Sequence, residues 1–304
     1  MANRLIAADV MLPEKNGERP CFNTSECIGQ IWIEGTEYYG EKPLLSIATP
    51  DYQSMVEQAI DAMKSGSFEK VVLSRIIALR ISQDFNTDDI IKRLREKYAS
   101  ACIFHLVMGD GQEWFGATPE KLLVKRGDQW STIALAGTRS VTQKTPWTDK
   151  EIHEEDVVKE YIVSVLEANG AANITVSDRY ERAAGNLIHL AHDIAFVSDK
   201  AVSFWTKLLH PTPAVCGLPR SLAQDFISHH EPHGRGLYTG LLGVVYPNLD
   251  ADVYVILRCA MRKGDDLFLF VGGGITANSD WRDEYQETEF KADTLKSILF
   301  YVES

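Results

Sequence analysis

The sequence carries little positive charge for its length. It has 31 lysines and arginines against 43 aspartates and glutamates, which gives a formal net charge of -12. No basic run interleaved with aromatic residues occurs in the chain. A protein that grips nucleic acid neutralises phosphates with basic side chains, so this composition argues against a nucleic-acid partner. It favours a small-molecule partner.

Cysteines and long apolar runs are also scarce. No CxxC pair and no histidines at zinc-site spacing accompany the five cysteines, which are Cys21, Cys27, Cys102, Cys216 and Cys259. This pattern predicts reduced thiols in a cytoplasmic protein. The apolar stretch at the amino terminus is short and is interrupted by Asp9, and no later segment approaches membrane-spanning length. Neither a secretory signal nor a membrane span is therefore expected.

The remaining composition is that of an ordinary globular protein, with 45% hydrophobic and 24% charged residues in 304 positions. Apolar periodicity predicts helices at 51–66, 87–99, 149–168 and 203–210, and a final helix through Lys291. Short strands are predicted at 69–81, between 102 and 137 as one antiparallel meander, and between 240 and 275. Because strands and helices come in clusters, we expect an α+β fold.

Two pairs of glutamates have helical spacing. Glu284 and Glu287 are three residues apart, as are Glu151 and Glu154, so each pair lies on one face of its helix. The second pair continues into the apolar stripe of the helix at 149–168, which directs it toward the protein interior. Two such pairs facing each other would suit Mg2+. The alternative is that acids in a first helical turn merely complement the helix dipole.

A glycine run at 272–274 precedes the pair Glu284 and Glu287. Missing side chains let an anionic ligand approach the backbone, although a tight turn or a bulge would use the same residues. Arg258 stands among apolar residues in what is predicted to be the interior of a strand, and Lys291 follows Glu287 by one helical turn. These cations suggest a carboxylate ligand, with a buried structural ion pair as the alternative.

Three further residues are candidates for proton chemistry. Lys70 opens an apolar strand, where burial would favour a neutral amine that acts as a base, although a solvent-facing lysine at a strand edge is the alternative. Glu120 follows the turn after "WFGATP" and is either an acid or the first polar residue of the next element. His189 in "NLIHLAHD" is by default a hydrogen-bonded interior histidine.

The motifs of the chain, taken in order, resemble those of the chorismate-utilising enzymes. They include "EKVVLSR", "GATPEKL", "ALAGTR", "HPTPAVCGLPR", "RGLYTGLLG" and "GGGITANSDWRDEYQETEFKA". The family includes isochorismate, anthranilate, aminodeoxychorismate and salicylate synthases. The resemblance implies two related halves, with large antiparallel sheets packed face to face and helices outside. It also implies a chorismate-binding catalytic domain at 49–304 and a shortened amino-terminal lobe at 1–48, which together form one compact unit.

The resemblance also implies roles for single residues. Glu154 and Glu287 would bind Mg2+ directly, and Glu151 and Glu284 would support it by holding metal-bound waters. The other residues of the pocket would bind the substrate, and they are Gly137, Thr138, His189, Arg258, Gly272 and Lys291. Arg258, Lys291 and the backbone at Gly272 would receive a substrate carboxylate, while His189 would lie near the ring hydroxyl.

Three features distinguish the sister reactions within the family, and one is the loop "HPTPAVCGLP", which resembles isochorismate synthases more than the amidotransferase-coupled branch. Members that add water resemble this chain in having lysine at position 70, where anthranilate synthases have glutamine. Aminodeoxychorismate synthases carry a nucleophilic lysine where this chain has Ala136. The resemblance therefore implies an isochorismate synthase, an isomerase in which Lys70 activates water for C2 of chorismate and Glu120 protonates the departing C4 hydroxyl. Salicylate synthase is the second candidate, and a catalytically inactive chorismate-binding homologue is the third.

The chain departs from the usual family pattern in two respects. Glu155 stands where many relatives have histidine after the metal-binding glutamate, and the amino-terminal lobe is shorter than usual. Isochorismate feeds both menaquinone and catechol siderophore biosynthesis, and the sequence does not choose between these pathways. The resemblance favours a cytoplasmic monomer without a glutamine amidotransferase subunit.

Overall fold

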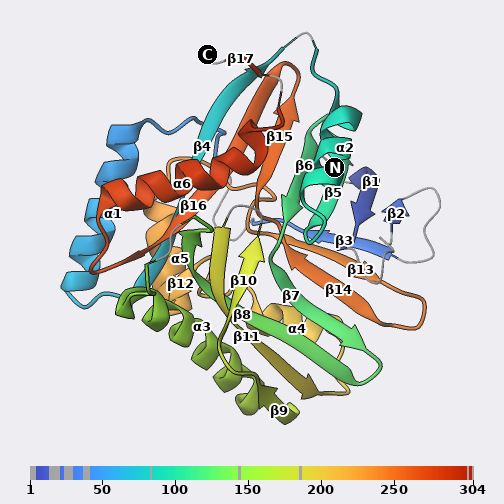
Figure 1. The fold of residues 1–304 in the computed structure, drawn as a ribbon, viewed down its shortest axis with the longest axis vertical. Coiled ribbons are helices and arrows are strands. Elements are labelled where there is room, and N and C mark those ends of the chain that lie inside the picture. Colours follow the sequence, from blue (N-terminus) through green and yellow to red (C-terminus); the bar gives the residue numbers. More distant parts are fainter. Residues whose placement is uncertain are drawn as a thin grey trace.

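Two antiparallel sheets and six helices make up the part of the chain that the structure describes (Figure 1). This computed structural model describes residues 5–13, 21–23, 30–36, 42–82, 84–142, 145–184, 187–299 and 301–302. The predicted α+β class is confirmed. Among these residues, no helix combines the length and the apolar character needed to cross a membrane.

The first sheet has nine strands in the order β12-β4-β16-β15-β6-β5-β1-β2, and β17 also pairs with β4. Its long central pair is β4 with β16, in antiparallel register from Lys70 opposite Thr276 to Arg80 opposite Asp266. The strand bounds are β1 Leu5–Met11, β2 Cys21–Asn23, β4 Lys70–Ile81, β5 Cys102–Met108, β6 Glu113–Thr118, β12 Gly217–Leu218, β15 Cys259–Lys263, β16 Asp266–Thr276 and β17 Tyr301–Val302.

The second sheet has eight strands in the order β10-β11-β8-β7-β14-β13-β3, and β9 also pairs with β11. Its longest pair is β8 with β11, whose register places His189 opposite Thr138. The strand bounds are β3 Gln30–Glu34, β7 Lys121–Arg126, β8 Gln129–Ser140, β9 Ala172–Val176, β10 Tyr180–Ala184, β11 Leu187–Val197, β13 Leu241–Val245 and β14 Ala251–Val255.

The two helices that reach the site, α3 and α6, both begin with a side-chain cap. The helix bounds are α1 Thr49–Lys64, α2 Thr87–Lys97, α3 Asp149–Ala168, α4 Val202–Leu209, α5 Arg220–His230 and α6 Trp281–Lys296. The α3 helix starts at a capping box, in which the backbone N–H and the hydroxyl of Thr148 donate to Glu151 over 2.7 and 2.9 Å. In α6, the N-cap residue Asp280 accepts the backbone N–H of Arg282 over 2.8 Å.

The hydrophobic core lies between the sheets and extends under the helices. Successive side chains of a strand point to opposite faces. In β16, Phe270 therefore packs with Tyr254 of the eight-stranded sheet, while Leu269 packs against the layer that contains Leu295 of α6. A separate cluster joins α3 and α4 to β7, β8, β11 and β14. The predicted arrangement, two packed sheets with helices outside, is confirmed.

The segment between 102 and 137 is not one meander, as the sequence analysis predicted. The strands β5 and β6 pair in the nine-stranded sheet, while β7 and β8 pair in the eight-stranded sheet. The chain crosses between the sheets at Pro119 and Glu120. Proline has no backbone N–H and cannot continue a ladder, and the carbonyl of Glu120 instead accepts the N–H of Val255 over 2.9 Å.

The prediction that Arg258 lies inside a strand is also wrong. The β14 strand ends at Val255 and β15 begins at Cys259, so Arg258 lies in another crossing between the two sheets, the second crossing at the pocket. Its backbone adopts a φ of 47°, which is outside the strand region. The carbonyl of Arg258 accepts the N–H of Ala117 over 3.2 Å, which joins the second crossing to the first.

Several elements were not predicted, among them α5 and β10. The sequence analysis proposed no helix at Arg220–His230, where α5 lies, and no strand at Tyr180–Ala184, where β10 lies. The α5 helix buries only Ala223 and Ile227, so its apolar periodicity is weak. The β10 strand is short and lies at the edge of its sheet, where charged residues are tolerated.

The amino-terminal residues complete both sheets. The strands β1 and β2 lie at one end of the nine-stranded sheet, and β3 lies at one end of the eight-stranded sheet. The division into a lobe at 1–48 and a domain at 49–304 stays a prediction. Cys21 is exposed, Cys102, Cys216 and Cys259 are buried, and Cys27 lies outside the described residues.

We expect Gly116→Ala to destabilise the protein by about 3 kcal/mol or more, because backbone has to move. A Cβ at Gly116 would lie 2.5 Å from the carbonyl oxygen of Arg258 and 2.9 Å from the Cα of Cys259. Gly111→Ala is the control, since only its φ of +82° opposes a side chain there, at a cost of about 1 kcal/mol. Urea unfolding of both variants measures the difference, and equal losses would contradict close packing at the crossing.

Candidate active site

One pocket brings together most of the residues that the sequence analysis selected. It lies where α3, α6, both crossings and the strands β4, β8, β11 and β16 meet. Nine of the candidate residues line it, and these are Lys70, Glu120, Gly137, Glu154, His189, Arg258, Gly272, Glu287 and Lys291. Residues far apart in the sequence therefore share a single cavity.

The two crossings bring the carboxyl group of Glu120 and the guanidinium of Arg258 to this pocket. Glu120 is only 8% exposed, and burial raises its pKa to about 7. The nearby cations Arg182, Arg258, Lys291 and Lys70 oppose this shift but do not cancel it. Near neutral pH, the Glu120 carboxyl is therefore present in both its protonated and its ionised form, which is the property needed of a general acid.

Lys70 does not face solvent, so the surface alternative is excluded. Its exposed fraction is 5%, and its side chain lines the pocket from the first position of β4. Within the described part of the chain, no carboxylate forms an ion pair with the Lys70 ammonium group. Gly274 faces it across the β4–β16 pair, and a Cβ there would lie 3.1 Å from Cε and 3.5 Å from Nζ of Lys70.

The glycine run lies inside β16 and forms neither a tight turn nor a bulge. Its residues pair in unbroken register with Ser74, Leu73 and Val72 of β4. At Gly272, a Cβ would lie 2.8 Å from both the Tyr238 hydroxyl and the Leu73 carbonyl oxygen, which is too close. The absent side chains therefore leave room for groups that project over the strand from other elements.

The carboxylates of α6 project over the middle glycine of this run. A Cβ built on Gly273 would lie 3.6 Å from Oε2 of Glu284, 3.7 Å from the Tyr52 hydroxyl and 3.8 Å from Oε1 of Glu287. Glu154 reaches the same pocket from α3. Acidic side chains of both helices thus converge, as the sequence analysis expected of a site for Mg2+.

Glu151 differs from the other three acidic residues. Its carboxylate accepts both donors of Thr148 at the start of α3, so it acts in this structure as the capping residue that the helix-dipole alternative describes. A supporting role at a metal stays a prediction for Glu151. The side chain of Thr138 lies outside the described part of the structure, and only its backbone pairing with His189 is known.

His189 is held in one tautomer. Its Nδ1 lies 3.2 Å from the carbonyl oxygen of Gly137, which can only accept, so Nδ1 carries the proton and Nε2 can accept a hydroxyl hydrogen. Burial, followed by the charges of Arg258 and Lys291, lowers the pKa of His189 to about 3. The ring is therefore neutral at physiological pH.

Lys291 is positioned by its own helix and by the glycine strand. Its Nζ donates to the Gly272 carbonyl over 2.8 Å and to Oε1 of Glu287 over 2.6 Å. Gly272 thus uses its carbonyl to hold a cation at the pocket. The Arg258 guanidinium donates to the Thr294 hydroxyl of the same helix over 2.8 Å.

Sequence reasoning missed the residues that shape the pocket wall. Tyr238, Thr239 and Val215 line it, and the buried Arg235 behind them donates to the Val215 carbonyl over 3.1 Å. Arg235 is neutralised by the buried Glu231 over 2.6 Å. These residues lie within the motifs "RGLYTGLLG" and "HPTPAVCGLPR", but no local spacing signals that the two segments meet.

Comparison with known proteins agrees with this arrangement. The family model described as chorismate binding enzyme matches residues 41–300. The chain belongs to this family. Isochorismate synthase EntC of Escherichia coli (strain K12) is 29% identical over 260 residues, which cover 82% of this chain and 66% of that relative. The chain therefore spans slightly less than two thirds of the length of that relative.

Solved structures of family members have the same fold. A putative 2,3-dihydroxybenzoate-specific isochorismate synthase, DhbC from Bacillus anthracis, is 24% identical with a TM-score of 0.78, covering 96% of this chain and 83% of its own. MenF, the menaquinone-specific isochorismate synthase from Escherichia coli, is 28% identical with a TM-score of 0.75, covering 85% of this chain and 64% of its own.

Glu120 predicts a specific pH dependence of stability. Its pKa is 4.5 in the unfolded chain and about 7 in the folded protein. Between these pH values, folding must keep the carboxyl protonated, so the free energy of unfolding falls as pH rises and stays lower above pH 7. The loss amounts to at most about 3 kcal/mol.

We therefore expect Glu120→Gln to be more stable relative to the parent at pH 8 than at pH 5. The substitution removes the ionisation while keeping the shape of the side chain. Urea unfolding at both pH values measures the effect, with the exposed Glu96→Gln as the control that shows no such trend. An equal effect of Glu120→Gln at both pH values would contradict the raised pKa.

Proposed function

We propose that this protein is an isochorismate synthase, an isomerase that interconverts chorismate and isochorismate with Mg2+. One observation carries the proposal: Lys70 and Glu120 are both buried in the pocket, and Glu120 has a pKa of about 7. A base and an acid that share a cavity suit a reaction in which one hydroxyl is added and another is lost. The relatives named isochorismate synthase support the same activity.

The substrate would be held by the cations of the pocket. Chorismate carries two carboxylates, and Arg258 and Lys291 line the cavity from the second crossing and from α6. Their positions are fixed by Thr294 and Gly272, so little side-chain freedom is lost on binding. His189 would accept a hydrogen bond from a ring hydroxyl through Nε2.

The acidic residues fit Mg2+ by their chemistry. Their donor atoms are all oxygens, which Mg2+ prefers, and Glu284 and Glu287 converge over Gly273, where no side chain fills the space. Glu154 and Glu287 would bind the ion directly, with Glu284 and Glu151 in support. When bound, Mg2+ would offset the charge of a substrate carboxylate among these glutamates.

Proton transfer would be carried out by Lys70 and Glu120. In its neutral form, Lys70 would take a proton from water as the water oxygen forms a bond to C2 of chorismate. Both ring double bonds shift, the C4–O bond breaks, and Glu120 gives its proton to the departing hydroxyl, which leaves as water. The reverse reaction uses the same groups in opposite roles. No nucleophilic lysine is available at Ala136, which lines the pocket, so a covalent amine route is not proposed.

The cellular setting follows from the product. We infer that isochorismate formed here supplies menaquinone or catechol siderophore biosynthesis. We also infer that the enzyme acts in the cytoplasm as a monomer, without a glutamine amidotransferase subunit.

Proton NMR of chorismate incubated with the purified protein tests the proposal. We expect isochorismate to accumulate only with Mg2+, without pyruvate. Lys70→Ala is expected to lower kcat by about 100-fold to 10,000-fold, the usual contribution of a general base, whereas the exposed Lys64→Ala leaves it unchanged. Salicylate with equimolar pyruvate would show a salicylate synthase instead, and unchanged chorismate would show an inactive homologue.

A further inference from the structure

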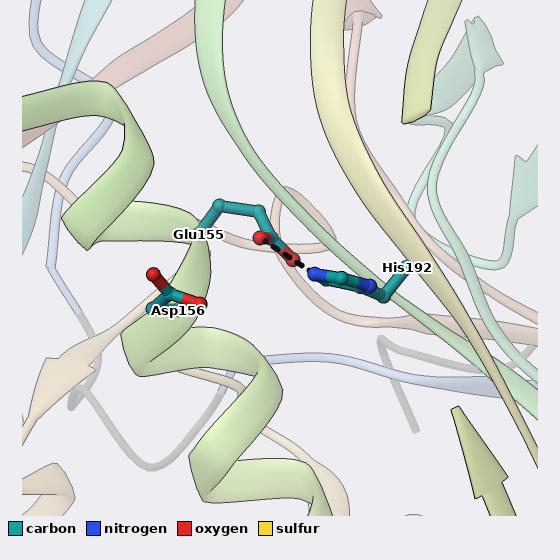
Figure 2. Close-up of side chains that lie close together, drawn as sticks. All are labelled: Glu155, Asp156 and His192. Carbon is teal, nitrogen blue, oxygen red and sulfur yellow. Dashed lines mark ion pairs between the residues drawn. The ribbon is translucent and has the colours of Figure 1, made fainter. Parts of the chain in front are cut away.

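A second cluster of potential metal ligands lies between α3 and β11, outside the lining of the pocket. Glu155, Asp156 and His192 each present one ligand atom, and these atoms lie within 4.8 Å of one another. The two acids follow Glu154 on α3, and His192 comes from β11 (Figure 2). The strand thus contributes an imidazole nitrogen, and the helix contributes carboxylate oxygens.

The orientation of His192 is set by a backbone carbonyl. Its Nδ1 lies 2.7 Å from the carbonyl oxygen of Ser177, which can only accept, so Nδ1 carries the proton. In the neutral ring, Nε2 is then a lone pair aimed at Glu155, 3.3 Å from Oε2 (Figure 2). The two groups form an ion pair when the ring is protonated, and in the neutral ring they present two lone pairs that a cation held between them would bind. A carbonyl on one ring nitrogen is also how metal-binding histidines are commonly oriented.

Two buried atoms of the cluster have no hydrogen-bond partner within the described residues. They are Oε1 of Glu155, in a residue that is 0% exposed, and Nε2 of His192, in a residue that is 8% exposed. A buried carboxylate oxygen without a partner is costly. Both atoms belong to the facing groups, so one ion could satisfy both.

A cation of the protein already touches this cluster from outside. Arg179 donates to Oε2 of Glu155 over 3.0 Å and to Oδ1 of Asp156 over 2.7 Å, and its side chain is 31% exposed. Lys159 also contacts Asp156. Arg179 does not reach Oε1 of Glu155, and its exposed guanidinium can turn toward solvent. It would therefore compete with a metal ion for the same carboxylates.

We propose that Glu155, Asp156 and His192 form a binding site for a borderline divalent cation such as Zn2+, separate from the proposed Mg2+ site. One imidazole nitrogen with two carboxylates suits Zn2+, whereas Mg2+ prefers oxygen ligands alone. The bound ion would link α3 to β11 directly beside Glu154. The inference does not depend on the reaction proposed above, because the site uses none of the catalytic residues.

Titration of the full-length protein with Zn2+, in saturating Mg2+ and without chorismate, tests the site. We expect one equivalent of Zn2+ to bind and to raise the melting temperature by a few degrees, because binding to the folded state stabilises it. Co2+ is expected to give a visible absorption band that Zn2+ abolishes. No binding under these conditions would overturn the proposal and leave the proposed reaction untouched.

Substitutions assign the binding to this cluster. His192→Gln is expected to weaken Zn2+ binding by at least about 30-fold, while His153→Gln, at an exposed histidine of the same helix, leaves it unchanged. If His192→Gln fails to fold, Asp156→Asn supplies the same comparison at a side chain that is 30% exposed. Binding that survives in the folded variants would place the ion elsewhere and refute the assignment.

Arg179→Ala separates a metal site from a purely structural ion-pair network. A structural network would lose stability and gain nothing from the loss of Arg179. A metal site would lose a competing positive charge, so we expect Zn2+ affinity to rise about tenfold. Unchanged or weaker Zn2+ binding in Arg179→Ala would contradict the proposal.

Discussion

The pocket depends on how the chain passes between its two sheets. Two of its crossings, at Pro119–Glu120 and just before Cys259, lie at the pocket, and backbone hydrogen bonds join one to the other. Gly116 packs so closely against the Arg258 carbonyl that no side chain fits between them. Glu120 and Arg258 are therefore held by backbone constraints, which place them more precisely than mobile surface loops would.

Burial of charge gives the pocket its chemistry at a cost in stability. Glu120 is kept from easy ionisation by its apolar surroundings, although four cations lie near it. Lys291 and Glu287 neutralise each other while both still face the cavity. The glycine strand makes this crowding possible, because Lys70 and the α6 glutamates occupy space that side chains on β16 would otherwise fill. Glu120→Gln, which removes the proposed acid, is thus also expected to remove the energetic cost of ionising a buried carboxyl group.

Local patterns in the sequence predicted local structure well. The apolar stripe and its acidic start predicted the bounds of α3 at Asp149–Ala168, and the spacing placed each glutamate pair on one face of its helix without deciding whether the two helices meet. The break at Arg258 escaped prediction, because the run "VYVILRCAM" is apolar on both sides and no glycine or proline marks it. Only the tertiary contact with Gly116 reveals it. Tyr238 and Thr239 of the pocket wall were missed for the same reason, since nothing in their own segment points to the pocket.

The central claim is that water adds at C2 while the C4 hydroxyl leaves, with Lys70 and Glu120 moving the protons. Turnover of chorismate in water enriched in 18O, followed by mass spectrometry of the isochorismate, tests this most directly. The account predicts one 18O atom in each product molecule, at the C2 hydroxyl. Isochorismate formed without label would mean that the hydroxyl moves within the substrate, and it would contradict the roles given to both residues.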